Sequence, residues 1–162
     1  MIKITKDQLR EWRKPPEGFF KWLEFVKPKV LDRSNKIVPF EVQDFQREMF
    51  EGALECDSEG NYKYNTIIYS LPRRHSKTTC AGLLVLYRFC LFPNENIKVI
   101  SNSERQALRV NFKMLKDLIT NSSVLCNWVG VDNIQRTNIE LPDLGNKIEV
   151  VVGNIPSLYG ER

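Results

Sequence analysis

Several features that mark particular classes of protein are scarce in this sequence of 162 residues. It has a single histidine, His75, and its four cysteines show no C-x-x-C spacing, which argues against a zinc site and favours buried, reduced thiols over disulfides. No apolar run reaches the roughly 18 residues of a membrane span, and the N-terminal stretch does not resemble a signal peptide. We therefore expect a soluble intracellular protein with no membrane partner.

Charge of one sign is not in excess either. The sequence carries 24 Lys and Arg against 20 Asp and Glu, and its net charge of +4 permits contact with nucleic acid without requiring it. With 42% hydrophobic and 27% charged residues, the composition is that of an ordinary globular chain, long enough for one sizeable core. Composition leaves the function open, so the motifs must decide it.

The most informative segment is a basic turn between an apolar run and an apolar helix. Residues 66–71 (Thr-Ile-Ile-Tyr-Ser-Leu) predict a strand, and residues 80–92 are apolar nearly all round, which predicts a helix buried against a sheet. The turn between them, residues 72–79, reads Pro-Arg-Arg-His-Ser-Lys-Thr-Thr. A helix start attracts anions, Lys77 would add a charge that reaches the β- and γ-phosphates, and Thr78 would offer a hydroxyl to Mg²⁺. The segment therefore predicts a phosphate-binding loop.

The two glycines of the usual phosphate-loop pattern, G-x-x-x-x-G-K-[ST], are missing from this turn. Leu71 and Ser76 stand at those positions. Glycine lets the backbone turn tightly and approach phosphate, so Ser76 can replace it only in a backbone region that is open to L-residues. The alternative interpretation is a basic cap in front of a core helix.

The first third of the chain predicts helices and a ribbon. Residues 5–27 predict one or two short helices broken at Pro15-Pro16, and residues 30–40 look extended around a polar turn. A further helix is expected from about residue 42. Its apolar face is expected to consist of residues at i, i+3 and i+4 spacing, namely Val42, Phe45, Met49, Ala53 and Cys56.

The last third continues the alternation of strands and helices that is typical of a parallel α/β sheet. Residues 97–101 predict a strand, residues 103–119 a helix opened by a capping box, and residues 134–141 and 147–152 two strands around a turn. The buried stripe of that helix is expected to be Leu108, Phe112, Leu115 and Ile119. Beside the stripe lie the basic residues Arg105, Arg109, Lys113 and Lys116. They indicate either a solvated face or a surface for DNA or a second subunit.

Together these segments, from Pro39 to Arg162, resemble the ATPase domain of the large terminase subunit of tailed bacteriophages, the motor that pumps DNA into procapsids. That family commonly replaces the strict phosphate loop with an arginine-rich version, and residues 72–78 are similar to it. The resemblance implies catalytic roles at the phosphates for Arg73 and Lys77, and Mg²⁺ binding by Thr78. The ATP-binding residues that it implies in the loop are Arg73, Arg74, His75, Ser76, Lys77, Thr78 and Thr79.

The resemblance extends to an adenine-reading segment upstream of the loop. Terminases and related helicase-like ATPases carry an aromatic-Gln pair there, and residues 39–48 (Pro-Phe-Glu-Val-Gln-Asp-Phe-Gln-Arg-Glu) are similar to it. Gln46 is the expected adenine reader, because a Gln amide donates and accepts at once, which suits adenine N6 and N7. Gln43 is the second choice, and the alternative for either is an ordinary solvated helix residue.

Residues 148–162 look like the strand and loop that precede the Walker B strand in terminases. An apolar run ending in Asp-Glu, which would hold Mg²⁺ and orient the attacking water, is not found in the 162 residues. We therefore expect the front half of a larger protein, with an arm at residues 1–40 and the front part of a P-loop NTPase-type domain at residues 41–162. That domain would have a mostly parallel sheet flanked by helices, incomplete at its C-terminus. Such a fragment would bind nucleotide without hydrolysing it.

For the intact protein, the resemblance implies ATP hydrolysis that drives double-stranded DNA into procapsids and a C-terminal nuclease that cuts concatemeric DNA. It implies the portal protein and the small terminase subunit as partners, a homo-oligomeric ring, and a location in the host cytoplasm at the procapsid portal. An arginine acting in trans would come from Arg105, Arg109, Arg136 or Arg162. Two alternatives stay open: a helicase-like nucleic-acid-dependent ATPase, and a non-enzymatic module whose Arg73, Arg74 and Lys77 bind nucleic-acid backbone in a salt-dependent way.

Overall fold

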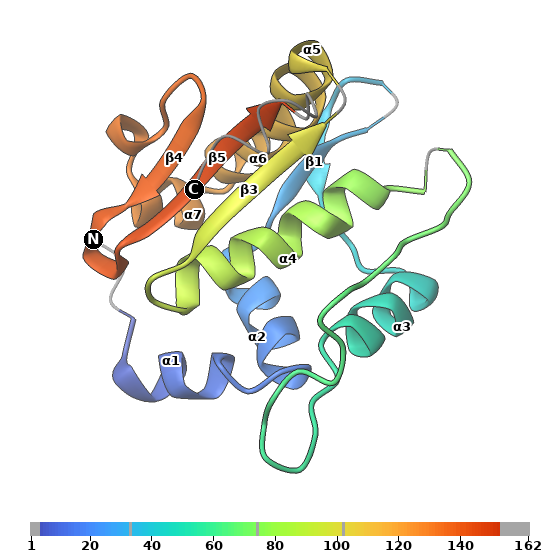
Figure 1. Ribbon diagram of the computed structural model, residues 1–162, viewed down its shortest axis with the longest axis vertical. Helices are drawn as coiled ribbons and strands as arrows, with labels where there is room; N and C mark the ends of the chain where they lie inside the picture. The colour runs from blue at the N-terminus through green and yellow to red at the C-terminus, as the bar shows by residue number, and fades with distance from the viewer. Residues whose placement is uncertain (1–3, 33, 74, 102, 153–162) are drawn as a thin grey trace.

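The computed structural model describes residues 4–32, 34–73, 75–101 and 103–152. The chain forms a mixed α/β structure in which helices pack around a three-stranded sheet in the order β3-β5-β4 (Figure 1). β3 (Asn96–Ser101) pairs in parallel with β5 (Asn146–Val152), and β4 (Asn138–Leu141) pairs with β5 in the antiparallel sense. The predicted combination of helices with parallel strand pairing is confirmed at this level, and β4 makes the sheet a mixed one.

The β4–β5 hairpin forms where the sequence predicts two strands around a turn. The connection is a 3-10 turn, Pro142–Leu144, followed by Gly145 at φ 68°, a backbone region that L side chains rarely adopt. Ile139 and Ile148 are cross-strand partners and both are fully buried. This pair therefore sets the face that the hairpin turns toward the core.

The N-terminal helices belong to the same core as the rest of the chain. α1 (Lys6–Trp12) and α2 (Glu17–Val26) are separated at Pro15-Pro16, as predicted. Gly18 allows the start of α2 to approach α1, because a Cβ at this position would lie 2.4 Å from a backbone oxygen at the end of α1. The ring of Trp22 on α2 packs at a steep angle against Tyr87, with 5.6 Å between centroids. The aromatic side chains of this segment thus have a packing role.

A two-stranded ribbon of β1 (Lys29–Leu31) and β2 (Ile37–Pro39) follows α2, in agreement with the extended pattern of residues 30–40. The ribbon is antiparallel, and the turn between its strands is held by Asp32, whose Oδ1 accepts from the backbone N–H of Ser34 at 2.8 Å. The polar turn that the sequence predicts at this point is confirmed.

α3 (Asp44–Ala53) then forms, and its buried face agrees with the predicted one at Ala53 but differs from it elsewhere. Gln46, Phe50 and Ala53 face the core, whereas Phe45 is 38% exposed. The ring of Phe50 lies 4.7 Å from that of Phe19 on α2, so a tertiary contact between aromatic rings decides which side of α3 is buried.

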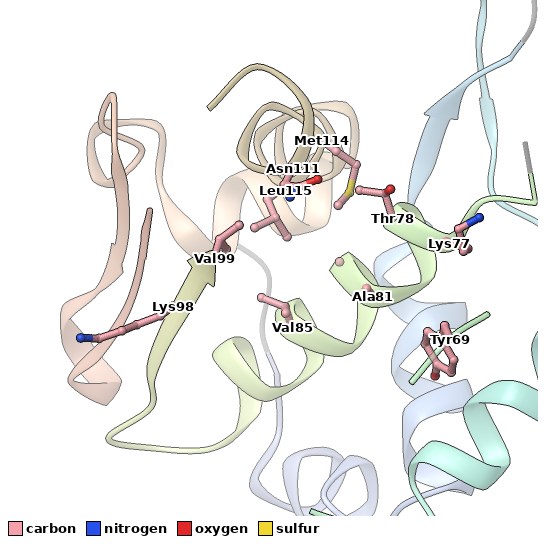
Figure 2. Close-up of a pocket in the computed structure, with 11 residues that line it drawn as sticks. Tyr69, Lys77, Thr78, Ala81, Val85, Lys98, Val99, Asn111, Met114 and Leu115 are labelled. Atoms are coloured by element: carbon pink, nitrogen blue, oxygen red, sulfur yellow. The ribbon is translucent and has the colours of Figure 1, made fainter. Parts of the chain in front are cut away.

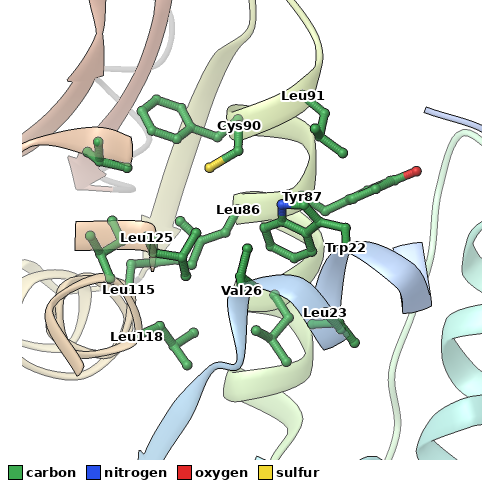
Figure 3. Packing of buried hydrophobic residues seen from close by; sticks show 14 of the residues in the cluster. Trp22, Leu23, Val26, Leu86, Tyr87, Cys90, Leu91, Leu115, Leu118 and Leu125 are labelled. Carbon is green, nitrogen blue, oxygen red and sulfur yellow. The ribbon is translucent and has the colours of Figure 1, made fainter. Parts of the chain in front are cut away.

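α4 (Lys77–Leu91) is the central helix, and its predicted burial is confirmed. In Figure 3 its side chains meet those of α2, α6 (Lys113–Asn121) and α7 (Ser123–Val129). All four cysteines are free, and Cys80 and Cys90 on α4 are buried thiols, as the sequence predicts. Within the described ranges, no helix combines the length and apolar character needed to cross a membrane.

The prediction of a strand at residues 66–71 is wrong. This segment is irregular and forms no ladder with another described segment, and Ile68 is 85% exposed. A strand is stabilised by hydrogen bonds to a neighbouring strand rather than by its own sequence. Residues 66–71 do not make these bonds, and the edge of β3 that faces away from β5 has no partner among the described strands. An apolar pattern alone was therefore not sufficient at this position.

The predicted helix at residues 103–119 is present, but in three pieces. α5 (Glu104–Gln106) leads into a π-helix, η1 (Ala107–Phe112), and then into α6. The stripe residues Phe112, Leu115 and Ile119 are buried as predicted, whereas Leu108 is partly buried and Ala107 takes an inward position. The wider turn of a π-helix shifts the phase of the segment, so a period of 3.6 residues fails for its first turns.

Candidate functional site

The first turn of α4 and the C-terminal end of β3 lie at the same end of the molecule. α4 and β3 follow one another with opposite directions, so the start of the helix comes to lie beside the last residues of the strand (Figure 1). A cavity of about 360 Å³ opens between α4, β3 and the η1–α6 segment. Polar residues on its lining include Tyr69, Lys77, Thr78 and Asn111 (Figure 2). This is the candidate site.

The backbone at the start of α4 has the shape that the missing glycine would provide. Ser76 adopts φ 55° and ψ 24°, the left-handed region, and its side chain does not cap the helix. The N–H groups of Lys77, Thr78 and Thr79 make no hydrogen bond to the described residues. The helix therefore presents open donors and a partial positive charge, an arrangement that suits an anion.

Lys77 folds back over the loop that precedes it. Its Nζ donates to the carbonyl oxygens of Leu71 at 2.5 Å and Pro72 at 3.0 Å. An ammonium group has three donors, so one remains available for a ligand at the helix start. The ammonium group of Lys77 thus lies over the loop that leads into the first turn of α4.

The basic loop contacts α3 through an aromatic pair, His75 of the loop and Phe45 of the helix. His75 approaches Phe45 with 6.0 Å between centroids, and its Nδ1 lies 3.1 Å from the Arg73 carbonyl oxygen. The Arg73 side chain is exposed, and Arg74 lies outside the described residues. Thr79 points to a separate pocket on the side of β1 and α6, so the structure does not bring it to the cavity of Thr78.

Gln46 is placed near the loop but outside the cavity. Its side chain is 4% exposed, and its Oε1 accepts from the backbone N–H of Gln43 at 3.0 Å, half of a capping box that opens α3. Gln43 itself is exposed. Because Phe45, the neighbour of Gln46, contacts the loop, the start of α3 and the start of α4 lie close to each other.

The donor set suits a magnesium ion that arrives with phosphate. Thr78 offers an exposed hydroxyl and Asn111 a carboxamide oxygen, and oxygen ligands are those that Mg²⁺ prefers. The described lining of the cavity contains no carboxylate, and the described part of the chain has no group of three or more His, Cys, Asp or Glu placed to hold a metal. The negative charge that the ion requires would therefore come from phosphate.

Asn111 and Tyr69 are among the residues of this cavity that sequence reasoning did not predict as part of a site. Asn111 lies on η1 and donates from Nδ2 to the Ser101 hydroxyl at 2.8 Å, and the π-helical turn that places it has no recognised signal in the sequence. Tyr69 comes from the irregular segment in front of the loop and donates to the Met49 carbonyl oxygen at 3.3 Å. Burial raises the pKa of Tyr69 to about 12, so it remains a neutral wall of the cavity at physiological pH.

The four basic residues next to the helix stripe are not equivalent. Lys113 is paired with Asp117 at 2.5 Å, and Lys116 lies over the Phe112 ring, with a pKa lowered by burial. Arg105 and Arg109 are exposed.

The other arginines considered for a role in trans differ in what the structure says of them. Arg136 is exposed, and its carbonyl oxygen accepts from Lys116 at 3.4 Å. Arg162 lies outside the described residues.

Comparison with known proteins adds no relative. A scan against protein-family models finds no match to this chain, and a search of curated proteins finds no similar sequence. Any statement on function therefore depends on the residues and geometry of the site.

Proposed function

We propose that this chain binds Mg-ATP at the start of α4, as the ATP-binding part of a DNA-packaging motor of the large terminase type. The observation that carries the proposal is the left-handed Ser76, which stands at the motif's glycine position and is followed directly by Lys77 and a helix start with open N–H groups. A basic cap in front of a core helix would not require this backbone conformation.

Each loop residue has a defined task in the proposal. The N–H groups of Lys77, Thr78 and Thr79 hold phosphate oxygens, and the Lys77 ammonium moves from the Leu71 and Pro72 carbonyls to the β- and γ-phosphates. Thr78 supplies an oxygen to Mg²⁺, which neutralises phosphate charge when bound. Arg73 is exposed and free to reach the terminal phosphate.

Adenine recognition is proposed for Gln46 through its Nε2, because its Oε1 is engaged by Gln43. The Gln46 Nε2–H would then donate to adenine N7, and the N6 amino group would need an acceptor from another residue. His75, Ser76 and Arg74 would line the phosphate side of the same ligand.

The proposal assigns nucleotide binding, not hydrolysis, to these residues. In an intact motor, hydrolysis would move double-stranded DNA, with the portal protein and the small terminase subunit as partners. A helicase-like ATPase would use the same binding residues, and Arg105 and Arg109 would be available to nucleic acid in both cases.

The test is calorimetry of Mg-ATP binding to the wild-type chain, to Lys77→Ala and to Lys6→Ala, which removes an exposed lysine on α1. We expect the wild type and Lys6→Ala to bind equally, and Lys77→Ala to bind about tenfold or more weakly, because a charged hydrogen bond is lost. A folded wild type that binds no ATP, but binds DNA in a salt-dependent manner, would overturn the proposal in favour of a backbone-binding module.

A further inference from the structure

Asn111 is the residue of the η1–α6 segment whose amide lines the cavity opposite the first turn of α4. It lies in the six-residue π-helix Ala107–Phe112, inside a segment that is otherwise α-helical. π-helical turns are rare and occur frequently where a functional side chain must be directed. In Figure 2, Asn111 and Thr78 approach the cavity from facing elements, with Met114 between them.

The orientation of the Asn111 amide is set by the end of β3. Its Nδ2 donates to the hydroxyl of Ser101, which is 8% exposed at the last position of the strand. The donor side of the amide is thereby anchored to the sheet. The Oδ1 has no hydrogen-bond partner among the described residues, so its acceptor capacity remains for a group in the cavity.

The other polar side chains of the cavity each have at least one partner, and Lys77 keeps a donor to spare. Tyr69 donates to the Met49 carbonyl, and Lys77 bonds the loop carbonyls. Lys98 forms an ion pair with Glu149, with 3.8 Å between its Nζ and the Glu149 Oε1. Two oxygens with spare capacity thus belong to residues that line the cavity, the Thr78 hydroxyl and the Asn111 carbonyl, and the Met114 side chain lies between these two residues (Figure 2).

We propose that Asn111 is a positioning residue for the Mg²⁺ ion that would accompany the nucleotide, its Oδ1 offering an acceptor to the water shell of that ion. This inference rests on the proposed function. Mg²⁺ bound through phosphates keeps several of its waters, and those waters donate, so an anchored acceptor on the far wall holds them in place. The Met114 thioether, which packs on Gly82, is flexible enough to leave room for such a water.

The test compares ATP affinity in Mg²⁺ with ATP affinity in EDTA, by calorimetry on the full chain. Asn111→Leu is expected to lower the ratio of the two affinities about three- to tenfold, the worth of one hydrogen bond. Asn111→Asp, which has the same shape, is expected to raise the ratio, because its charge attracts Mg²⁺ and repels bare phosphate. Asn127→Leu, at an exposed position of α7, is the control and leaves the ratio unchanged.

A purely structural role for Asn111 predicts a different result. It would shift the melting temperature of Asn111→Leu and leave the Mg²⁺ ratio of every folded variant unchanged, which would overturn the inference. If Asn111→Leu does not fold, the same Mg²⁺ ratio is measured for Asn111→Asp and for Ser101→Ala. Ser101→Ala removes the hydroxyl that accepts from Asn111 Nδ2. A wild type that binds ATP equally with and without Mg²⁺ overturns this inference alone, whereas a wild type that binds no ATP in either condition overturns the proposed function with it.

Discussion

The two ends of α4 differ in their hydrogen bonds. At the C-terminal end, carbonyl groups and side chains of the helix bond to other elements, whereas at the N-terminal end the first N–H groups have no partner among the described residues. Asn146 on β5 donates to the carbonyls of Phe89 and Phe92, at 2.6 Å each, and accepts from the N–H of Glu95 at 2.7 Å. Tyr87 donates to the Trp12 carbonyl at 2.5 Å. These bonds join α4 to α1 and to the sheet.

The N-terminal end shows the opposite pattern. Ser76 is in a left-handed conformation without a capping bond, and the next N–H groups make no hydrogen bond to the described residues. Ile68, in the segment that leads to this end, is 85% exposed. The first N–H groups of a helix are open to water or to a ligand, and a left-handed non-glycine residue costs backbone strain, so the bonds at the C-terminal end of α4 offset a cost at its N-terminal end.

The largest effect is expected from breaking the closed end. Asn146→Ala leaves the buried Phe89 carbonyl, the part-buried Phe92 carbonyl and the part-buried Glu95 N–H without this partner, so the free energy of unfolding should fall by about 3 kcal/mol. Urea denaturation measures this loss, and Asn127→Ala, at an exposed site, should change it by less than about 0.5 kcal/mol. A small loss for Asn146→Ala would mean that these bonds do not hold the end of α4.

The next effect concerns pH. Burial raises the pKa of the Cys80 thiol from its ordinary 9.0 to about 11. The unfolded thiol therefore ionises first as pH rises, so the stability from this group is complete below about pH 9 and is lost between pH 9 and 11. The slope is up to about 1.4 kcal/mol per pH unit. Replacing Cys80 with Ala should flatten the alkaline part of a plot of unfolding free energy against pH; an unchanged slope would show that the thiol is accessible to water.

A smaller effect should come from relieving strain at the open end. Ser76→Gly removes the side-chain cost of the left-handed conformation and should raise stability by about 0.5–1 kcal/mol, after the larger entropy of glycine in the unfolded chain is subtracted. Ser76→Val should lower it, because a β-branched side chain fits this region poorly. In urea denaturation, the midpoint should rise for Ser76→Gly and fall for Ser76→Val relative to the wild type. Midpoints that move in the same direction would show that the backbone of Ser76 is not strained.

The smallest effect on stability is expected for Lys77→Met. The ammonium bonds two carbonyls of a partly exposed loop, so the free energy of unfolding should change by less than about 1 kcal/mol, while Mg-ATP binding weakens about tenfold or more. Thermal melts and calorimetry on the same sample separate the two. A stability loss as large as that of Asn146→Ala would identify Lys77 as a structural cap and remove the contrast between the ends.

Much of the local structure could be predicted because it depends on neighbours in the sequence. The break at Pro15-Pro16, the buried helix after the basic turn and the β4–β5 hairpin follow from proline geometry, an apolar run and turn residues. Lys77 and Thr78 could be placed at a helix start for the same reason. What failed depended on distant partners: residues 66–71 do not pair with the open edge of β3, and α3 turns toward Phe19 on α2.

The sequence by itself determined the two N-terminal helices, the β4–β5 hairpin, the burial of α4 and the position of a basic loop at its start, because periodicity and turn chemistry act over a few residues. The tertiary structure decided the left-handed Ser76, the capping role of Gln46 and the π-helical turn that brings Asn111 opposite Thr78. These features arise where segments far apart in the chain must satisfy each other's hydrogen bonds and volumes, and no local pattern carries that information.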